Sequence, residues 1–431
     1  MFKNKINNNN TSREIKDIFY LLALQGLNYI APLLVLPYLM KVLGAEKFGY
    51  IGFSMSVMQY LMLVVDFGFN FTATKRIALA KGNQTELNEI FTSTFYAKIS
   101  LLIISLLALC VIALIPRFEI YRETMFVMFL MVVGNAFTFV WLFQGLGNIR
   151  FISIFNMIAK LSILPLTFIF VKSSEDYLTA AFLHSSVAMF AMLISVAYVL
   201  KKRWVAVSAF VKKNVISALK ESYPLFLSSA ATSVYTISFV VALGYFATAE
   251  QVGQYSAAER IMRALCYMIF IPVSQAFYPK IVSLGTENRK EALALIKKIF
   301  IFVSACMLLV FLAMFFLSPY AVDFFGKDYR DSLPLFKIMA FVPVFVGMGG
   351  VVAQLGILAL GNATDKKNYQ RVYFVAGAIA LTSIFVTIPF WGANGAAVSL
   401  LLTEIIVCGL MGWYGRKIVI NGRENNNVNY K

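Results

Sequence analysis

Long apolar stretches fill most of the chain, and their length is the feature that most constrains the fold. A helix needs roughly 20 apolar residues to cross a bilayer. Within hydrocarbon, only helices and closed barrels pair all of their backbone hydrogen-bonding groups. The sequence therefore predicts an all-α polytopic membrane protein of about 12 transmembrane helices. The expected spans are residues 18–42, 50–71, 91–115, 125–146, 152–171, 177–200, 223–246, 255–277, 299–317, 333–360, 372–390 and 395–413.

The composition excludes an ordinary soluble domain. Of the 431 residues, 60% are hydrophobic and 14% are charged, whereas soluble domains are roughly half apolar and a quarter charged. The first apolar run, residues 18–42, is too long for the apolar region of a signal peptide. We therefore expect it to remain in the mature protein as the first span.

The basic residues predict the orientation of the chain. Lys and Arg gather in the N-terminal tail, in alternate loops and in the C-terminal tail, and they are sparse in the other loops. Because cytoplasmic loops carry the excess of Lys and Arg, both termini are expected in the cytoplasm. The net charge of +17 is then a topology signal, and no nucleic-acid partner is expected. The basic loops are 72–90, 201–222, 278–298 and 361–371.

A short internal repeat suggests that the chain consists of two similar halves. Residues 45–49 read AEKFG and residues 249–253 read AEQVG, and each segment lies between two apolar runs. Duplicated halves are common in transporters. We expect a cytoplasmic tail (1–17), an N-lobe of six helices (18–200), a basic amphipathic cytoplasmic linker lying on the membrane (201–222), a C-lobe of six helices (223–413) and a second cytoplasmic tail (414–431).

Four cations fall inside the expected spans: Lys98, Lys160, Arg260 and Arg263. Each costs roughly 2.5–3.5 kcal/mol at a helix centre on insertion scales, so each needs a partner or a polar cavity. Lys98 lies at a depth comparable to Asp66. The two either form a structural ion pair, or Asp66 binds the coupling ion while Lys98 binds substrate.

The remaining cations are the stronger candidates for an anion site. Lys160 lies near the middle of its span, with Asn156 one turn earlier on the same helix face. Glu259 and Arg263 have the i,i+4 spacing of a local ion pair, which leaves Arg260 without a local partner. A guanidinium on a cavity wall can bind phosphate through two parallel hydrogen bonds.

Two further titratable groups lie at membrane depth. Glu404 is expected either to face Lys160 across the lobe interface or to take up a coupling proton. His184, the one histidine, is interpreted as an interior histidine with a hydrogen bond rather than as a proton relay. A single histidine excludes a His-rich metal site. The four cysteines, Cys110, Cys266, Cys306 and Cys408, lack the paired spacing of a metal or redox motif.

Motifs that would indicate catalysis are missing from the sequence. There is no Walker A sequence, no GxSxG and no HExxH. We therefore expect a transporter without enzymatic activity, cofactor or metal. The short outer loops also leave no room for a folded catalytic domain outside the membrane.

One N-terminal run carries a family resemblance. It reads LPYL at 36–39, LG at 43–44, FG at 48–49, DFGFN at 66–70 and TKRIA at 74–78. The run resembles the Wzx-type O-antigen (polysaccharide repeat-unit) flippases of the multidrug/oligosaccharidyl-lipid/polysaccharide (MOP) exporter superfamily. Over the rest of the chain the resemblance rests on helix number, topology and length.

The resemblance implies two pseudo-symmetric six-helix lobes around a central cavity in a bacterial inner membrane. It implies alternating-access flipping of undecaprenyl-pyrophosphate-linked O-antigen units to the periplasmic leaflet, driven by proton or sodium coupling. Membrane lipids, a polysaccharide polymerase and a chain-length regulator are the implied partners. The cationic interior fits a pyrophosphate: Arg260, Lys160, Lys98, Arg263 and Asn156 are predicted to bind substrate, and Asp66 and Glu404 to bind the coupling ion.

Three alternatives compete with this prediction. A drug antiporter of the same fold should favour acidic residues in its cavity, whereas this interior is mainly cationic. An O-antigen polymerase or ligase should have large outer loops. A purely structural membrane protein would gain nothing from charges at membrane depth.

Overall fold

The computed structural model describes the backbone of residues 8–428 and the side chains of residues 34–234 and 236–416. Residues 1–7 and 429–431, the ends of the two expected tails, lie outside this part. Within it every regular element is a helix. In chain order these are α1 (Asn8–Asp66), α2 (Phe69–Leu79), α3 (Gln84–Ala113), η1 (Pro116–Tyr121), α4 (Arg122–Phe137), α5 (Val140–Gly145), α6 (Ile149–Phe170), η2 (Ser174–Asp176), α7 (Tyr177–Lys202), α8 (Lys212–Phe246), α9 (Ala249–Glu287), α10 (Arg289–Phe325), η3 (Lys327–Ser332), α11 (Leu333–Ala340), α12 (Val342–Gly350), the π-helix η4 (Val351–Leu358) and α13 (Ala363–Val428).

The prediction of an all-helical chain with many apolar spans is confirmed. By length and composition, nine stretches of the described residues could cross a membrane, or ten if the two parts of the bent helix α8 count as one span. Two of these stretches, Leu34–Leu79 and Ala363–Arg416, contain a break in helical geometry. The break lies at Gly44 in α1 and at Gly392 in α13, where φ is +70° and +52°. Glycine takes such positive values at little steric cost.

Helix ends follow local sequence signals. The side chain of Asn83 accepts a hydrogen bond from the backbone N–H of Glu86 at the start of α3. Thr248 begins α9 in the same way. Both residues therefore satisfy a backbone donor that the helix itself leaves unpaired. Between α1 and α2 the chain turns through Phe67 and Gly68, both at positive φ.

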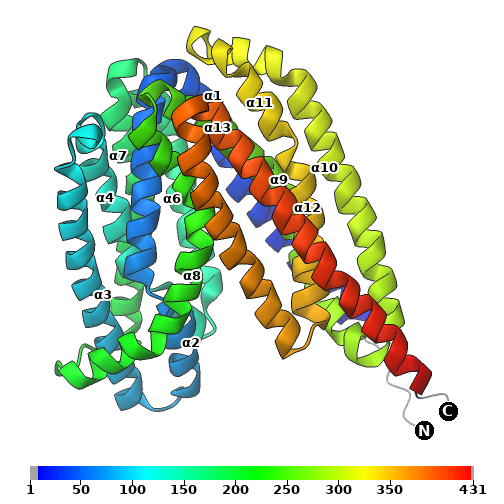
Figure 1. The fold of residues 1–431 in the computed structure, drawn as a ribbon. Coiled ribbons are helices and arrows are strands. Elements are labelled where there is room, and N and C mark those ends of the chain that lie inside the picture. The colour runs from blue at the N-terminus through cyan, green and yellow to red at the C-terminus, as the bar shows by residue number, and fades with distance from the viewer. Residues whose placement is uncertain (1–7, 429–431) are drawn as a thin grey trace.

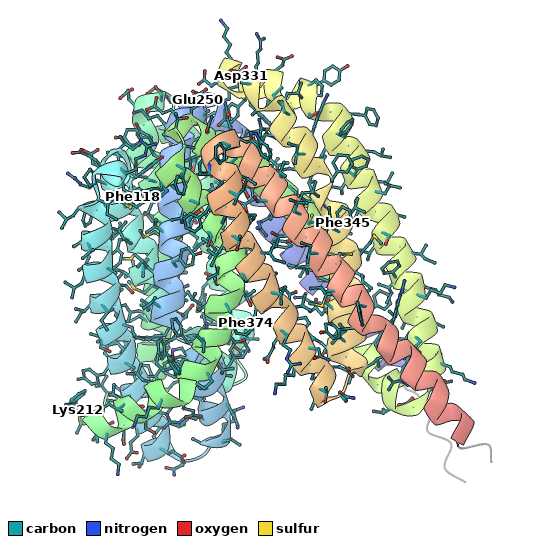
Figure 2. The ribbon with its side chains drawn as sticks, in the orientation of Figure 1. Phe118, Lys212, Glu250, Asp331, Phe345 and Phe374 are labelled. Atoms are coloured by element: carbon teal, nitrogen blue, oxygen red, sulfur yellow. The ribbon has the colours of Figure 1, made fainter. Side chains whose placement is uncertain are left out.

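The helices form two groups that come together at one end of the molecule (Figure 1). Helices α3, α4 and α7 lie on one side, and α10, α11 and α12 on the other. At the upper end in this view, α1 and α13 each turn back on themselves, and the two groups approach one another. Toward the lower end the groups diverge. Lys212 lies at the lower end, whereas Glu250 and Asp331 lie at the upper end (Figure 2).

Helices α1 and α9 pack closely where they meet. A Cβ atom on Gly49 would overlap the carbonyl oxygen of Ala249, and one on Gly253 would overlap that of Ala45. Small residues at such a position let two helix backbones touch, which is the main source of contact between helices in lipid. Phe48 and Phe53 of α1 are fully buried beside this contact. The AExxG segments identified in the sequence are thus packed against each other.

The connection between the expected lobes, residues 201–222, is partly extended and partly helical. Helix α7 ends at Lys202 and α8 begins at Lys212, so the helices are joined by residues 203–211, which form no helix. Two hydrogen bonds hold the joining segment along α3. The side-chain amide of Gln84 donates to the backbone carbonyl of Trp204, and the side-chain carbonyl of Asn88 accepts from the backbone N–H of Ala206. The second half of the expected linker is the first part of α8. The first helix also begins at Asn8, before the expected span that starts at residue 18.

Candidate functional site

A cavity of about 670 Å³ lies among five helices and is the centre of the candidate site. Its walls come from α1, α6, α7, α8 and α9. Most of the lining is apolar, but charged and hydrogen-bonding side chains interrupt it, which is the usual character of a ligand site. The lining residues are Val35, Leu36, Leu39, Gly52, Met55, Ser56, Gln59, Lys160, His184, Thr236, Ile237, Val240, Ser256, Glu259, Arg260, Arg263, Ala264 and Tyr267.

Three of the predicted substrate-binding cations line this one cavity. Lys160 extends from α6, and Arg260 and Arg263 extend from α9. The chain thus brings together basic groups that lie about a hundred residues apart in sequence. Asn156 is half-buried one turn before Lys160 and is not among the residues that line the cavity.

Arg260 contacts a methionine sulfur and an aromatic ring, and neither of these neighbours carries a negative charge. One Nη2 hydrogen points to the sulfur of Met55 at 3.0 Å, and the guanidinium carbon lies 5.3 Å from the centre of the Phe48 ring. Among the described side chains no carboxylate pairs with Arg260. A cation over an aromatic ring is stabilised by the ring's electron density but keeps its full charge. Its hydrogen-bond donors therefore remain able to bind an anion in the cavity.

Arg263 makes the local ion pair that the sequence predicts. Its Nη2 and Nε atoms lie 2.8 and 2.9 Å from Oε1 of Glu259. It also donates to the Tyr267 hydroxyl at 3.4 Å and to the Thr236 carbonyl at 3.3 Å. Four contacts leave this guanidinium much less able to bind substrate than Arg260.

Lys98 and Asp66 pair with each other away from this cavity. The Nζ atom of Lys98 lies 3.0 Å from Oδ1 of Asp66, and the two side chains are 3% and 27% exposed. Of the two sequence interpretations, the structure therefore has the ion pair. Neither residue lines the cavity that holds Lys160 and Arg260.

Glu404 lies beside a second, smaller pocket rather than facing Lys160. This pocket measures about 160 Å³, and Glu404 lines it together with Arg263 and Tyr267. Only 7% of Glu404 is exposed. Arg263, Tyr267 and Thr236 line both this pocket and the larger cavity, so the two are neighbours across the Arg263 side chain.

His184, expected from the sequence to be a hydrogen-bonded interior histidine, lines the cavity together with Gln59. The Nδ1 atom of His184 is buried without a hydrogen-bond partner in the described part of the chain, as is the hydroxyl of Ser256. Unpaired polar atoms on a cavity wall are available to a ligand. Their polarity inside apolar spans was visible in the sequence, but the direction in which each side chain points depends on helix rotation.

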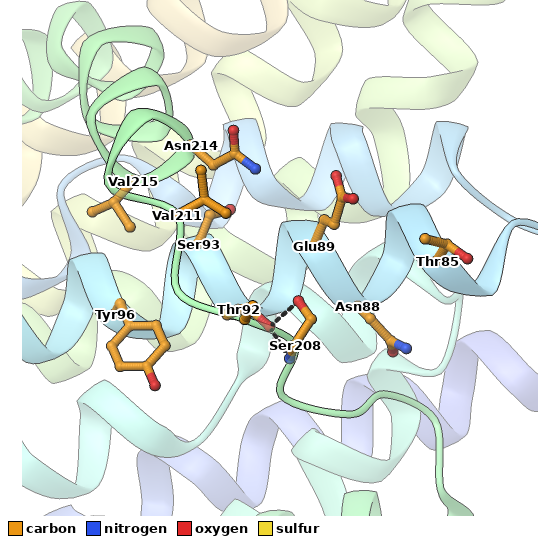
Figure 3. A pocket seen from close by; sticks show the side chains of 11 residues that line it. Thr85, Asn88, Glu89, Thr92, Ser93, Tyr96, Ser208, Val211, Asn214 and Val215 are labelled. Carbon is orange, nitrogen blue, oxygen red and sulfur yellow. Dashed lines mark hydrogen bonds between the residues drawn. The ribbon is translucent and has the colours of Figure 1, made fainter.

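A third pocket, of about 220 Å³, lies apart from these two at the lower end of α3 (Figure 3). Residues Ser208, Ala209 and Val211 of the joining segment line it. The N–H and the hydroxyl of Ser208 both donate hydrogen bonds to the Thr92 hydroxyl, at 2.8 and 3.0 Å. No cation lines it, and it contains none of the predicted site residues. Among the described residues, no group of three or more His, Cys, Asp or Glu side chains could hold a metal ion.

Sequence comparison finds related proteins over nearly the whole chain. Residues 15–285 match the model of a family described as polysaccharide biosynthesis protein. An Escherichia coli (strain K12) protein named "Putative O-antigen transporter" is 32% identical over 401 residues, which cover 92% of this chain and 95% of that protein. A Shigella dysenteriae protein of the same name is 30% identical over 393 residues, covering 91% and 97%.

Solved structures share the fold. An inward-facing multidrug resistance MATE family transporter of the MOP superfamily matches with a TM-score of 0.67 at 13% identity, covering 92% of this chain and 99% of that chain. The lipid II flippase MurJ, in an inward closed conformation, matches with a TM-score of 0.67 at 16% identity, covering 95% and 92%. At these identities the likeness establishes the fold alone.

Proposed function

The chain belongs to the polysaccharide biosynthesis protein family, and we propose that it flips undecaprenyl-pyrophosphate-linked O-antigen units across the bacterial inner membrane. The observation that carries the proposal is that Lys160 and Arg260 line one cavity and lie on helices long and apolar enough to cross a membrane. A pyrophosphate crosses hydrocarbon only at a high free-energy cost, because an unpaired charge is strongly disfavoured there. Two cations in a polar cavity compensate that charge during crossing.

Arg260 binds the pyrophosphate most directly in this proposal. Its planar donor fork matches two phosphate oxygens, and its present neighbours, Met55 and Phe48, do not compete as anions. Lys160 adds a second charge from the opposite group of helices. Gln59, Ser56 and His184 supply hydrogen bonds around them, which suits the sugar hydroxyls nearest the pyrophosphate.

We infer twelve crossings, grouped as two six-helix lobes at residues 18–200 and 223–413. Dividing α1 at Gly44 and α13 at Gly392 supports this number, because each then forms two antiparallel helices that meet at the upper end (Figure 1). The lower end is then cytoplasmic, and α1 begins and α13 ends toward that end. Basic Lys212 at that end fits the rule that cytoplasmic loops carry the excess of Lys and Arg (Figure 2).

Alternating access follows from this arrangement. The helix groups approach at the proposed periplasmic end and diverge at the proposed cytoplasmic end, which supports an inward-facing conformation. Separation of α1 from α9 would open the other end. The relatives named for O-antigen transport and for lipid II flipping support a lipid-linked oligosaccharide as the transported molecule. A polymerase and a chain-length regulator are the proposed downstream partners.

Coupling to a proton or sodium gradient is assigned to Glu404 in preference to Asp66. Asp66 is engaged by Lys98 at 3.0 Å, whereas Glu404 makes no hydrogen bond or ion pair among the described side chains. An antiporter for cationic drugs is disfavoured by the two cations of the cavity. A polymerase or ligase function is disfavoured, because two relatives of this chain are named as transporters.

Deletion of the gene tests the proposal, with the surface polysaccharide and the lipid-linked intermediates both measured. We expect surface repeat units to disappear while lipid-linked units accumulate on the cytoplasmic side. A surface that carries single repeat units without polymer would instead indicate a polymerase. Unchanged polysaccharide with altered drug sensitivity would indicate the antiporter and would end the role assigned to Arg260.

A further inference from the structure

Arg263 separates the substrate cavity from the pocket that contains Glu404. Its side chain lines both, together with Tyr267 and Thr236. On the substrate side its guanidinium is bonded to Glu259, which also lines that cavity. While this pair holds, the Glu259 charge is cancelled, and the net charge of the substrate cavity is that of Lys160 and Arg260.

Glu404 presents a nearly buried carboxyl group to the other side of Arg263. It makes no hydrogen bond or ion pair among the side chains that the structure describes. Its pocket is otherwise mainly apolar, with Phe270, Val342, Phe345, Val346, Leu400 and Val407 in the walls. A carboxylate in such surroundings is disfavoured unless it takes up a proton or gains a cation.

Arg263 is the charged neighbour that can supply that cation. Its electrostatic field reaches Glu404 from α9. The other titratable groups near Glu404 are neutral ones: Cys266 and Tyr267 on α9, and Tyr373 and Cys408 on α13. Helices α8 and α12 contribute only uncharged residues to this pocket. Glu259 and Glu404 are therefore two carboxyl groups with one arginine between them.

We propose that Arg263 is a positioning residue that makes the charge of the substrate cavity depend on the protonation of Glu404. With the proton on Glu404, Arg263 stays on Glu259 and the cavity is cationic. When Glu404 releases its proton to the aqueous phase, its carboxylate competes for Arg263, and Glu259 is left facing the bound anion. Loss of that proton therefore weakens diphosphate binding. This inference rests on the proposed function, because it needs a diphosphate in the cavity.

Binding of a short prenyl diphosphate tests the inference without transport. Purified full-length protein in detergent is titrated with farnesyl diphosphate by calorimetry at about pH 5.5 and about pH 8, which bracket the range in which a perturbed carboxyl group titrates. We expect wild-type affinity to fall roughly tenfold at the higher pH, because one negative charge is uncovered beside the ligand. The probe itself becomes more negative as pH rises. That change alone would strengthen binding, so the two effects have opposite signs.

Two variants identify the residues responsible. Glu404→Gln cannot release a proton, and the double variant Glu259→Gln with Arg263→Gln lacks both the carboxyl group and the arginine that would exchange partners. Each should therefore bind at least as tightly at the higher pH as at the lower. Asp323→Asn alters an exposed ion pair with Arg330 and should behave as the wild type. If Glu404→Gln is not monodisperse, the double variant still decides the question.

The outcomes separate this inference from the proposed function. Wild-type binding whose fall with pH persists in both Gln variants overturns the role of Arg263 and leaves the diphosphate site intact. Failure of the wild type to bind farnesyl diphosphate at either pH overturns the proposed site and the inference together.

Discussion

Gly49 of α1 and Gly253 of α9 occupy matching positions in the two AExxG segments, and each faces the backbone of the other segment. The contact is reciprocal: Gly49 meets Ala249, and Gly253 meets Ala45. Reciprocal contacts of this kind are the property of a two-fold interface. The short repeat thus has a structural counterpart, as a duplicated chain with pseudo-two-fold symmetry would have.

The first prediction concerns this close approach. Gly253→Ala should lower the thermal stability of the purified protein, because its Cβ would overlap the Ala45 carbonyl. Overpacking of this kind costs about 1–3 kcal/mol. Gly409→Ala is the matched control, since open space surrounds a Cβ there. Equal melting temperatures for the two variants would contradict the tight α1–α9 contact.

The second prediction concerns Arg260. Arg260→Ala should reduce polysaccharide export by roughly ten- to a hundredfold, because a hydrogen-bonded charge contributes about 1.5–3 kcal/mol. Arg260→Lys should retain part of the export, since it keeps the charge but loses the planar fork. Export is measured by complementing the deletion strain, with protein level checked in the membrane. Arg330→Ala, at an exposed ion pair, should export normally. Full export by Arg260→Ala would remove this residue from the site.

The all-helical class and the presence of many apolar spans could be predicted from the sequence, because apolar length alone decides them. The span expected at residues 152–171 is α6 at Ile149–Phe170, and the one expected at 91–115 is α3 at Gln84–Ala113. An ion pair within one helix could also be predicted from the sequence: the Glu259–Arg263 pair follows from the i,i+4 spacing of the two residues.

Contacts between helices could not be predicted in the same way. Whether Glu404 faces Lys160 or Arg263 depends on the rotation of α13 and on its position along α9, which are set by packing. The close approach of Gly392 on α13 to the Gln251 side chain on α9 is one such packing contact. The gathering of Lys160, His184 and Arg260 around one cavity is likewise a product of the assembled helices.

The third prediction concerns the ion pair between Asp66 and Lys98. Lys98→Met should destabilise the protein by about 2 kcal/mol, because it leaves a carboxylate in a largely buried place. The effect should be smaller than for a fully buried pair, since Asp66 is 27% exposed. The double variant Asp66→Asn with Lys98→Met should recover much of the loss in thermal melting. Loss of export from a double variant of normal stability would show that the pair has a role in transport.

The fourth prediction concerns orientation. Single cysteines at Ser208 and at Asp331, in a variant without the four native cysteines, should react with a membrane-impermeant thiol reagent from opposite sides. Ser208 belongs to the segment between α7 and α8, and Asp331 lies at the other end of the molecule (Figure 2). In intact cells only the Asp331 position should react, and Ser208 should react after the membrane is opened. The reverse pattern would invert the proposed topology.

The fifth prediction concerns access of water to the cavity. Gln59→Cys should react with an aqueous thiol reagent in opened membranes, because thiolate forms only where water or a cation stabilises it and Gln59 lines the cavity. Leu107→Cys, which is 61% exposed on the apolar surface of α3, should not react, since hydrocarbon suppresses thiolate formation. Farnesyl diphosphate should slow the reaction at Gln59→Cys if it occupies the space beside Lys160 and Arg260. Reaction at Gln59→Cys that the diphosphate leaves unchanged would mean that water enters the cavity but the anion binds elsewhere.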